Sequence, residues 1–209
     1  MTEKLKSKEC EFVGKRIITF IGPEGSGKTT HALLLAEDTG LPYVTTGDTI
    51  RDLAANDPGE LGDECRAMFA EGRYLAGETL LRILVERFSR PDVQDGLILD
   101  GGLRTLEETI EFQAMLEQAG LDLPMTVIYL NIPEEETYDR LVRGKNARKR
   151  ADDTEEGVAS RLEKFNLLLE ERLNVIKNQP GWELVLLDAM PEEEVVYSQI
   201  SGVLTRDVS

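Results

Sequence analysis

The chain has 209 residues, of which 41% are hydrophobic and 31% charged. These values are ordinary for a globular protein and exclude wholesale disorder or a fibrous architecture. The length predicts one domain with small inserted subdomains. The formal net charge of −16 gives an average field that repels nucleic acid and anionic lipid. We therefore expect no nucleic-acid partner, and any anionic ligand must bind at a local basic patch.

The N-terminus and the cysteines indicate a cytoplasmic protein. Residues 1–15 mix lysines with acidic residues, contain no signal-peptide core, and are interpreted as a flexible extension before a domain at 16–209. No apolar run approaches the roughly 18 residues that a membrane helix requires, so we expect no membrane partner. Cys10 and Cys65 have no metal-ligand spacing, which argues against zinc and against a disulfide scaffold.

In chain order, the first element is the short apolar run Ile17–Ile21, which a glycine-rich turn ends and a helical stretch, His31–Glu37, follows. This order begins an α/β unit. Four further strand candidates are separated by segments long enough for crossover helices. They are Pro42–Thr45, Leu97–Asp100, Met125–Asn131 and Glu183–Asp188. The sequence therefore predicts one sheet of five parallel strands.

Helices are predicted between these strands. Apolar residues at helical spacing occur in Thr105–Ala119 and in Val158–Ile176. Asp153 is the expected N-cap of the second of these helices, with Glu156 three positions later. Pro133 is expected in the first turn of another helix. Residues 46–90 interrupt the alternation with three helical stretches and are interpreted as an inserted subdomain. The stretches are Gly47–Ala55, Glu60–Glu71 and Glu78–Ser89.

The segment from Gly22 to Thr29, Gly-Pro-Glu-Gly-Ser-Gly-Lys-Thr, matches the phosphate-loop pattern G-x-x-x-x-G-K-[ST] between a strand and a helix. Its glycines let backbone N–H groups point inward around an anion, and the next helix adds its N-terminus. Lys28 is expected to reach the β- and γ-phosphates, and the Thr29 hydroxyl to help hold Mg²⁺. The alternative is a plain glycine turn, which the strand and helix context disfavours.

Two further features fit a phosphate-transfer site. Asp100 ends the strand candidate Leu97–Asp100 and resembles the Walker B carboxylate that orients Mg²⁺, directly or through water. The alternative is an aspartate that caps the next turn. A cluster of arginines and lysines is suited to grip phosphate oxygens and exclude water, although it could also be a solvated charged loop. The cluster comprises Arg140, Arg143, Lys145, Arg148, Lys149 and Arg150, with Arg161 on the next helix.

Four ordered motifs together resemble adenylate kinase and related nucleoside monophosphate kinases. They are Gly22–Thr29, Thr45–Arg51, Leu99–Thr105 and Arg150–Asp153, and the resemblance runs from about Arg16 to the C-terminus. It implies a P-loop three-layer α/β/α fold with a helical monophosphate-binding insert and a short lid at 140–153. It also implies transfer of the γ-phosphate of ATP to a nucleoside monophosphate, with Mg²⁺ as cofactor, no zinc, and a monomer in solution.

The resemblance assigns roles position by position. The implied catalytic residues are Lys28, Arg104, Arg140, Arg150 and Arg161. The implied ATP-binding residues are Gly22, Glu24, Gly25, Ser26, Gly27, Lys28, Thr29, Thr30 and Arg140. The implied monophosphate-binding residues are Thr46, Arg51, Arg104, Glu108, Arg150 and Arg161, with Asp152 and Asp153 orienting the lid and Thr29 and Asp100 at the metal.

The chain departs from the family pattern at two places. Gly101-Gly102-Leu103-Arg104 stands where the family usually has Gly-Phe-Pro-Arg, which removes a stiffening proline from the loop that carries Arg104. Glu108 stands where adenylate kinases have the glutamine that reads adenine. An amide both donates and accepts, whereas a carboxylate only accepts and would suit guanine. We expect AMP as the acceptor, with GMP, UMP or CMP as alternatives.

Two other functions stay open on the sequence alone. The first is a nucleotide-dependent regulatory protein that has lost efficient transfer, a reading that the Gly102-Leu103 departure supports. The second is a P-loop ATPase or GTPase switch, which would hydrolyse nucleotide without an acceptor. The assay that separates these functions follows diphosphate formation with each monophosphate.

Overall fold

The computed structural model describes residues 14–71, 77–145, 147 and 153–205. Five strands form one parallel sheet in the order β2-β3-β1-β4-β5. The strands are β1 (Ile17–Ile21), β2 (Tyr43–Thr45), β3 (Leu97–Asp100), β4 (Met125–Asn131) and β5 (Trp182–Asp188). Each begins within one residue of its predicted start, and the predicted five-stranded parallel sheet is confirmed.

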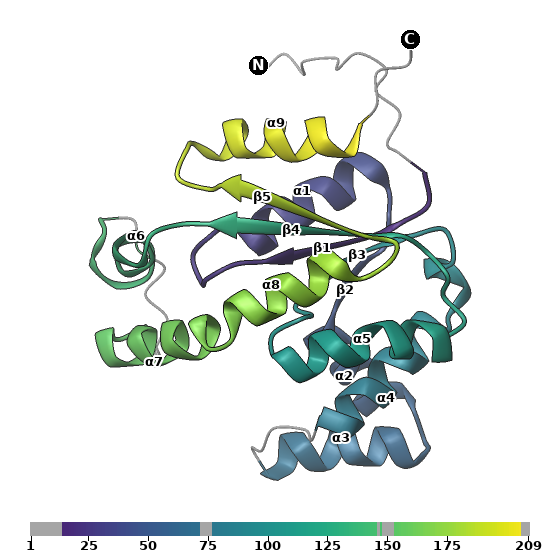
Figure 1. Ribbon diagram of the computed structural model, residues 1–209. Coiled ribbons are helices and arrows are strands. Elements are labelled where there is room, and N and C mark those ends of the chain that lie inside the picture. Colours follow the sequence, from purple (N-terminus) through teal and green to yellow (C-terminus); the bar gives the residue numbers. More distant parts are fainter. Residues whose placement is uncertain (1–13, 72–76, 146, 148–152, 206–209) are drawn as a thin grey trace, which may run out of the picture.

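Helices cover both faces of this sheet, which gives the expected three layers. In Figure 1, α1 and α9 lie on one face, α5 and α8 lie on the other, and α2 to α4 form a group below the second face. The α-helices are α1 (Lys28–Thr39), α2 (Thr46–Asn56), α3 (Glu60–Glu71), α4 (Gly77–Phe88), α5 (Leu106–Gln118), α6 (Glu134–Tyr138), α7 (Glu155–Asn166), α8 (Leu169–Asn178) and α9 (Glu193–Leu204). Two short turns complete the set, the 3-10 turn η1 (Pro91–Val93) and the π-helical turn η2 (Asp139–Arg143).

The central strand β1 explains the two halves of the core. All five of its residues are buried, and they alternate between the faces because successive side chains of a strand point in opposite directions. Ile17 and Ile21 join the apolar cluster under α5 and α8, whereas Ile18 and Phe20 join the cluster under α1 and α9. Full burial of each such side chain stabilises the fold by about 1.5–3 kcal/mol. The sheet is therefore held from both sides.

The helices α2, α3 and α4 occupy the connection between β2 and β3 and have a small apolar cluster of their own. Leu53, Cys65 and Ile83 form it, with Ile50, Ala54 and Leu61 packed against it. The N-terminus of α2 is capped by Thr45, whose hydroxyl accepts a hydrogen bond from the amide of Asp48. The functional boundaries of this insert at 46–90 and of the lid at 140–153 stay predictions.

The structure corrects three helix predictions. The apolar stripe of Val158–Ile176 is divided between α7 and α8, because Leu168 adopts a left-handed backbone (φ 54°) between them. The N-cap of α7 is Thr154, whose hydroxyl accepts from the amide of Gly157, and not Asp153, whose carboxylate instead binds Arg161. Pro133 is the N-cap of α6 rather than a residue of its first turn.

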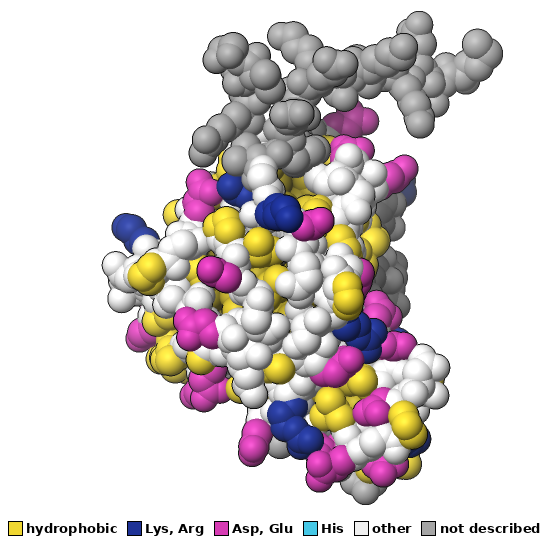
Figure 2. Space-filling view, turned by 90° about the vertical axis from the view of Figure 1, so that its right-hand side faces the viewer, with side chains coloured by type: hydrophobic (Ala, Val, Ile, Leu, Met, Phe, Trp, Pro, Cys, Tyr) yellow, Lys and Arg dark blue, Asp and Glu magenta, His cyan; other side chains and the backbone are white. Residues whose placement is uncertain are grey.

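Charges on the described surface are mixed. On the face in Figure 2, the Lys and Arg side chains that the structure describes stand singly or in small groups among Asp and Glu side chains. Pairs such as Arg66 with Asp63 at 2.7 Å are exposed, so each contributes only about 0–1 kcal/mol. Within the described residues, no helix is both long and apolar enough to cross a membrane.

Candidate active site

The carboxyl ends of β1 and β3 bring the predicted motifs together. The two strands are neighbours, with Phe20 in register with Asp100, and β1 also pairs with β4 on its other side. The helix after β1 (α1) and the helix after β3 (α5) cover opposite faces of the sheet, and open α/β folds bind ligands where the connections diverge in this way. The loop 22–27 leaves β1 here, and the loop 101–105 leaves β3 beside it.

The loop 22–27 has the backbone conformation of an anion cradle. Gly22 has a φ of 149°, and a Cβ atom there would lie 2.4 Å from the carbonyl oxygen of Leu130. Gly27 is left-handed (φ 91°) and is the N-cap of α1 without a side-chain cap. Any other residue at these positions would strain or block the loop. The amides at the start of α1 are thus available to an anion, as a phosphate loop requires.

Lys28 and its neighbours stay close to this loop. The Lys28 ammonium group donates to the carbonyl oxygens of Gly22 (2.9 Å) and Pro23 (2.7 Å), so it lies over the loop rather than in bulk solvent. Ser26 is buried inside the turn, whereas Thr29 and Thr30 are exposed in the first turn of α1. The structure therefore brings the predicted phosphate-loop residues together at one edge of the sheet.

Asp100 accepts hydrogen bonds from two hydroxyl groups, one on α1 and one on β2. The Thr29 and Tyr43 hydroxyls each donate to its Oδ2 at 2.7 Å. Burial and this hydrogen bond raise the pKa of Tyr43, so the phenol stays protonated and remains a donor. Hydroxyl and carboxylate oxygens are the ligands that Mg²⁺ prefers, and a site with so few protein ligands leaves room for the waters that Mg²⁺ retains. The residues present fit the metal that the family implies.

Two of the predicted arginines contact the phosphate loop from the other side. Arg140 on η2 donates to the carbonyl oxygens of Gly25 (3.1 Å) and Ala189 (3.0 Å), and its Nε donates to Glu136. Arg161 on α7 pairs with Glu24 at 3.1 Å and with the buried Asp153 at 2.8 Å. Arg150 and Asp152 lie outside the described residues. Arg140 and Arg161 are thus anchored to the loop through Gly25 and Glu24.

Arg143 from the same cluster is directed elsewhere. It pairs with Glu135 at 2.6 Å and with Glu155 at 2.8 Å, and its guanidinium lies 4.6 Å above the ring of Tyr138. The hydrogen bond with Glu155 raises the pKa of Arg143. Arg143 therefore links the turn η2 to the start of α7 and does not contact the phosphate loop.

The acceptor side is assembled around one hydrogen bond. The Thr46 hydroxyl donates to the carbonyl oxygen of Gly101 at 3.1 Å and so joins α2 to the loop after β3. The two predicted phosphate-binding arginines flank this bond. A Cβ atom on Gly101 would lie 2.6 Å from the guanidinium of Arg104, and one on Gly47 would lie 3.4 Å from that of Arg51. Each arginine thus lies over the glycine of its own segment.

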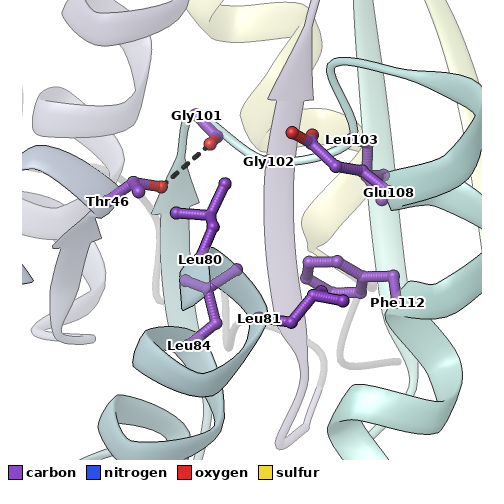
Figure 3. Close-up of a pocket in the computed structure, with 9 residues that line it drawn as sticks. All are labelled: Thr46, Leu80, Leu81, Leu84, Gly101, Gly102, Leu103, Glu108 and Phe112. Atoms are coloured by element: carbon purple, nitrogen blue, oxygen red, sulfur yellow. Dashed lines mark hydrogen bonds between the residues drawn. The ribbon is translucent and has the colours of Figure 1, made fainter. Parts of the chain in front are cut away.

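Glu108 faces Thr46 across a narrow apolar pocket, which Figure 3 shows in close-up. Glu108 is three residues into α5, and its carboxylate accepts a hydrogen bond from the amide of Arg104 at 2.7 Å. The free space is about 10 Å³. The pocket is lined by Thr46, Leu80, Leu81, Leu84, Gly101, Gly102, Leu103, Glu108 and Phe112.

Sequence reasoning did not identify Tyr43, the leucines of α4, or Arg172 as site residues. Tyr43 precedes the recognised motif by two positions and has no distinguishing pattern of its own. Arg172 did carry a signal, because it is a charged residue at the helical spacing of the apolar stripe of α8. It is only 3% exposed in the structure.

Comparisons with known proteins place the chain beside adenylate kinases. The family model described as adenylate kinase matches residues 20–179. An adenylate kinase of Cyanothece sp. is 33% identical over 189 residues, covering 90% of this chain and 94% of that protein. Adenylate kinase 1 of Synechocystis sp. is 36% identical over 145 residues, covering 69% of this chain and 74% of the relative. An adenylate kinase of Clavibacter michiganensis is 32% identical over 187 residues, covering 90% of this chain and 92% of that protein.

Proposed function

Because the chain belongs to the adenylate kinase family and is a phosphotransferase, we propose that it transfers the γ-phosphate of ATP to AMP and forms two molecules of ADP. One observation carries the proposal. The segment 100–104 serves both sides of the site, because Asp100 binds Thr29 beside the phosphate loop while Gly101 accepts from Thr46 on the acceptor side. A donor nucleotide at the loop and an acceptor at the pocket would thus meet at the end of β3.

In this proposal the acceptor phosphate is itself the nucleophile, so no Ser-His-Asp arrangement is required. The chain has to bring two polyanions into line and offset their repulsion. Lys28 and Arg140 act on the donor phosphates, Arg51 and Arg104 on the acceptor phosphate, and Arg161 between them. Mg²⁺, held near Thr29 and Asp100, would neutralise charge on the phosphate oxygens. The role of Tyr43 is to hold Asp100 in this position.

The narrow base pocket supports a conformational step before transfer. About 10 Å³ is far too little for a nucleobase, and three of the lining leucines belong to α4. We expect α4 to move away from α5 when the acceptor binds. Closure around both nucleotides would then exclude water, which prevents hydrolysis of ATP.

The identity of the base depends on Glu108. Its carboxylate already accepts from the Arg104 amide, and a carboxylate cannot donate to the ring nitrogen of adenine as a glutamine amide does. Thr46 at the opposite wall and the adenylate kinase relatives favour AMP. The carboxylate favours a base with adjacent donors, such as guanine. AMP is the proposed acceptor and GMP the second candidate, with UMP and CMP as further alternatives.

An acceptor panel tests the proposal. Purified protein is mixed with Mg-ATP and AMP, GMP, UMP or CMP in turn, and diphosphate formation is followed. We expect the highest kcat/KM with AMP; exclusive turnover of a pyrimidine nucleotide would refute the AMP preference. If no monophosphate is phosphorylated while ATP still binds, the regulatory function is correct instead. Hydrolysis of ATP at full rate without an acceptor would favour the ATPase function.

The substitution Glu108→Gln sharpens the panel. It restores a side chain that donates and accepts, so we expect kcat/KM for AMP to rise and the ratio of AMP to GMP use to increase about tenfold. Glu107→Gln, at the exposed neighbouring position on α5, is the matched control and should leave the ratio unchanged. A ratio that Glu108→Gln leaves unchanged would mean that Glu108 does not read the base.

A further inference from the structure

Arg172 is a buried arginine on α8 that the proposed phosphate transfer does not use directly. Its side chain is only 3% exposed, so it does not reach a nucleotide. Burial lowers the pKa of Arg172, and the nearby carboxylate of Glu108 opposes this change. A guanidinium removed from water destabilises the fold unless hydrogen bonds compensate. The positions of its partners therefore indicate what it stabilises.

The partners of Arg172 are backbone carbonyl groups from two different segments. Its Nη1 donates to the carbonyl oxygens of Leu103 (3.4 Å) and Arg104, and its Nη2 donates to that of Phe165 (2.7 Å). The guanidinium also lies 5.0 Å from the ring centre of Phe165. One side chain thus joins the loop that carries Arg104 to the C-terminal turn of α7, the helix that carries Arg161.

The loop that Arg172 contacts has an unusual backbone. Leu103 has a φ of 55°, and Leu103 and Leu168 are the two non-glycine residues with positive φ in the described part of the chain. Such a conformation is strained for a residue with a side chain and persists where surrounding contacts impose it. Arg172 touches both regions, because its amide donates to the carbonyl oxygen of Leu168 at 3.0 Å. The Arg172 side chain thus bonds the strained backbone of Leu103, whereas only the Arg172 backbone amide bonds Leu168.

We propose that Arg172 is a positioning residue for phosphate transfer, which fixes the backbone of Leu103 and Arg104 against α7 so that the Arg104 guanidinium lies over Gly101 at the acceptor site. The inference rests on the proposed function. Family members with Gly-Phe-Pro-Arg have a proline to stiffen this loop, whereas this chain has Gly102 and Leu103. Arg172 supplies the missing constraint from outside the loop.

The test compares Arg172→Met with Arg16→Met. Arg16 is also a largely buried arginine, bonded to Thr126 at 2.8 Å, but it precedes β1 at the opposite end of the sheet. For Arg172→Met we expect the KM of the best monophosphate in the panel to rise about tenfold and its kcat/KM to fall about 10²-fold, with the KM of ATP within twofold of the parent value. Arg16→Met should change neither KM, and equal losses in both variants would overturn the inference.

A double-substitution cycle separates positioning from general destabilisation. If Arg172 acts through Arg104, adding Arg172→Met to Arg104→Ala should reduce kcat/KM by less than about twofold more. Full additivity would contradict the inference. If Arg172→Met does not fold, Arg172→Lys takes its place, because an ammonium group retains the charge but cannot satisfy the separate carbonyl groups together. An acceptor KM that Arg172→Lys leaves unchanged would also contradict it.

A third measurement does not depend on turnover. Amide hydrogen exchange in Arg172→Met should become faster at 102–105 and stay unchanged at 22–29, because the segment 102–105 loses its bonds to Arg172 and the segment 22–29 loses none. Unchanged exchange at 102–105 would overturn the inference even if the parent protein is an active kinase. An inactive parent protein with faster exchange at 102–105 would refute the proposed function and leave the loop constraint supported.

Discussion

The loops 22–27 and 101–105 leave neighbouring strands at the same edge of the sheet, yet they reach their conformations by different means. The first uses glycines where φ is positive, at Gly22, Gly25 and Gly27. The second also has one such glycine, Gly101 at a φ of 104°, but it places the non-glycine residue Leu103 at a φ of 55° with only 1% exposure. Burial of a leucine contributes about 1.5–3 kcal/mol, which is similar to the cost of the strain. The phosphate loop therefore depends mainly on its own residues, and the acceptor loop depends on the core and on Arg172.

The largest effect is expected on the phosphate-loop side. Lys28→Met removes the charge that lies over Gly22 and Pro23 and should lower kcat by about 10³-fold or more, because nothing else in the loop supplies a mobile cation. Diphosphate formation measures the loss, and the thermal unfolding midpoint should change little. Retention of more than a tenth of the parent rate would contradict the assigned role.

Arg104→Ala breaks the acceptor side alone. The substitution removes the guanidinium over Gly101 but no contact of the phosphate loop, so we expect kcat/KM for the monophosphate to fall about 10²-fold. Calorimetric affinity for ATP should stay within about twofold. Lys177→Ala, in the last turn of α8, provides a control for loss of a positive charge. A parallel loss of ATP affinity would show that the two sides are not separable.

Leu103→Pro tests whether the acceptor loop differs from the usual family segment, Gly-Phe-Pro-Arg, in backbone conformation as well as in sequence. Proline fixes φ near −65° and cannot adopt the observed 55°, so restoring the usual family residue should lower the free energy of unfolding by about 3 kcal/mol more than Leu103→Ala does. The alanine variant controls for the lost side chain. Chemical denaturation measures both. A proline variant as stable as the alanine variant would show that the loop adopts either path without cost.

The smallest effect concerns His31, which packs beside Gly27 under the phosphate loop. Burial lowers its pKa from the ordinary 6.5. The unfolded chain therefore binds the proton first, and stability that is present above pH 6.5 is lost as the pH falls through the lower folded-state pKa. His31→Gln should remove this dependence, which is below about 1.4 kcal/mol per pH unit. If the free energies of unfolding of the parent and the variant changed equally between pH 7.5 and 5, this prediction would be contradicted.

Much of the fold was predictable because the signals are local. Each strand is a short apolar run, and the phosphate loop has glycines where the backbone needs them, so the five strands and the presence of a helix after this loop follow from neighbouring residues. The helix begins at Lys28, three residues before the predicted start at His31. The break at Leu168 was not predictable, since the apolar stripe continues through it. A single left-handed residue leaves the apolar spacing on either side unchanged, so no periodic pattern marks it.

The sequence by itself determined the parallel sheet, the phosphate loop, the Asp100 carboxylate and the family, because each depends on residue types at fixed spacing. Only the tertiary structure decided that Tyr43 holds Asp100, that Arg140 and Arg161 reach the loop through Gly25 and Glu24, and that Glu108 bonds the amide of Arg104. It also decided that Arg172 joins the loop at Leu103 to the last turn of α7, two segments that lie far apart in the chain. The physical reason is that these contacts depend on how the crossover helices pack on the sheet, and no local spacing encodes that packing.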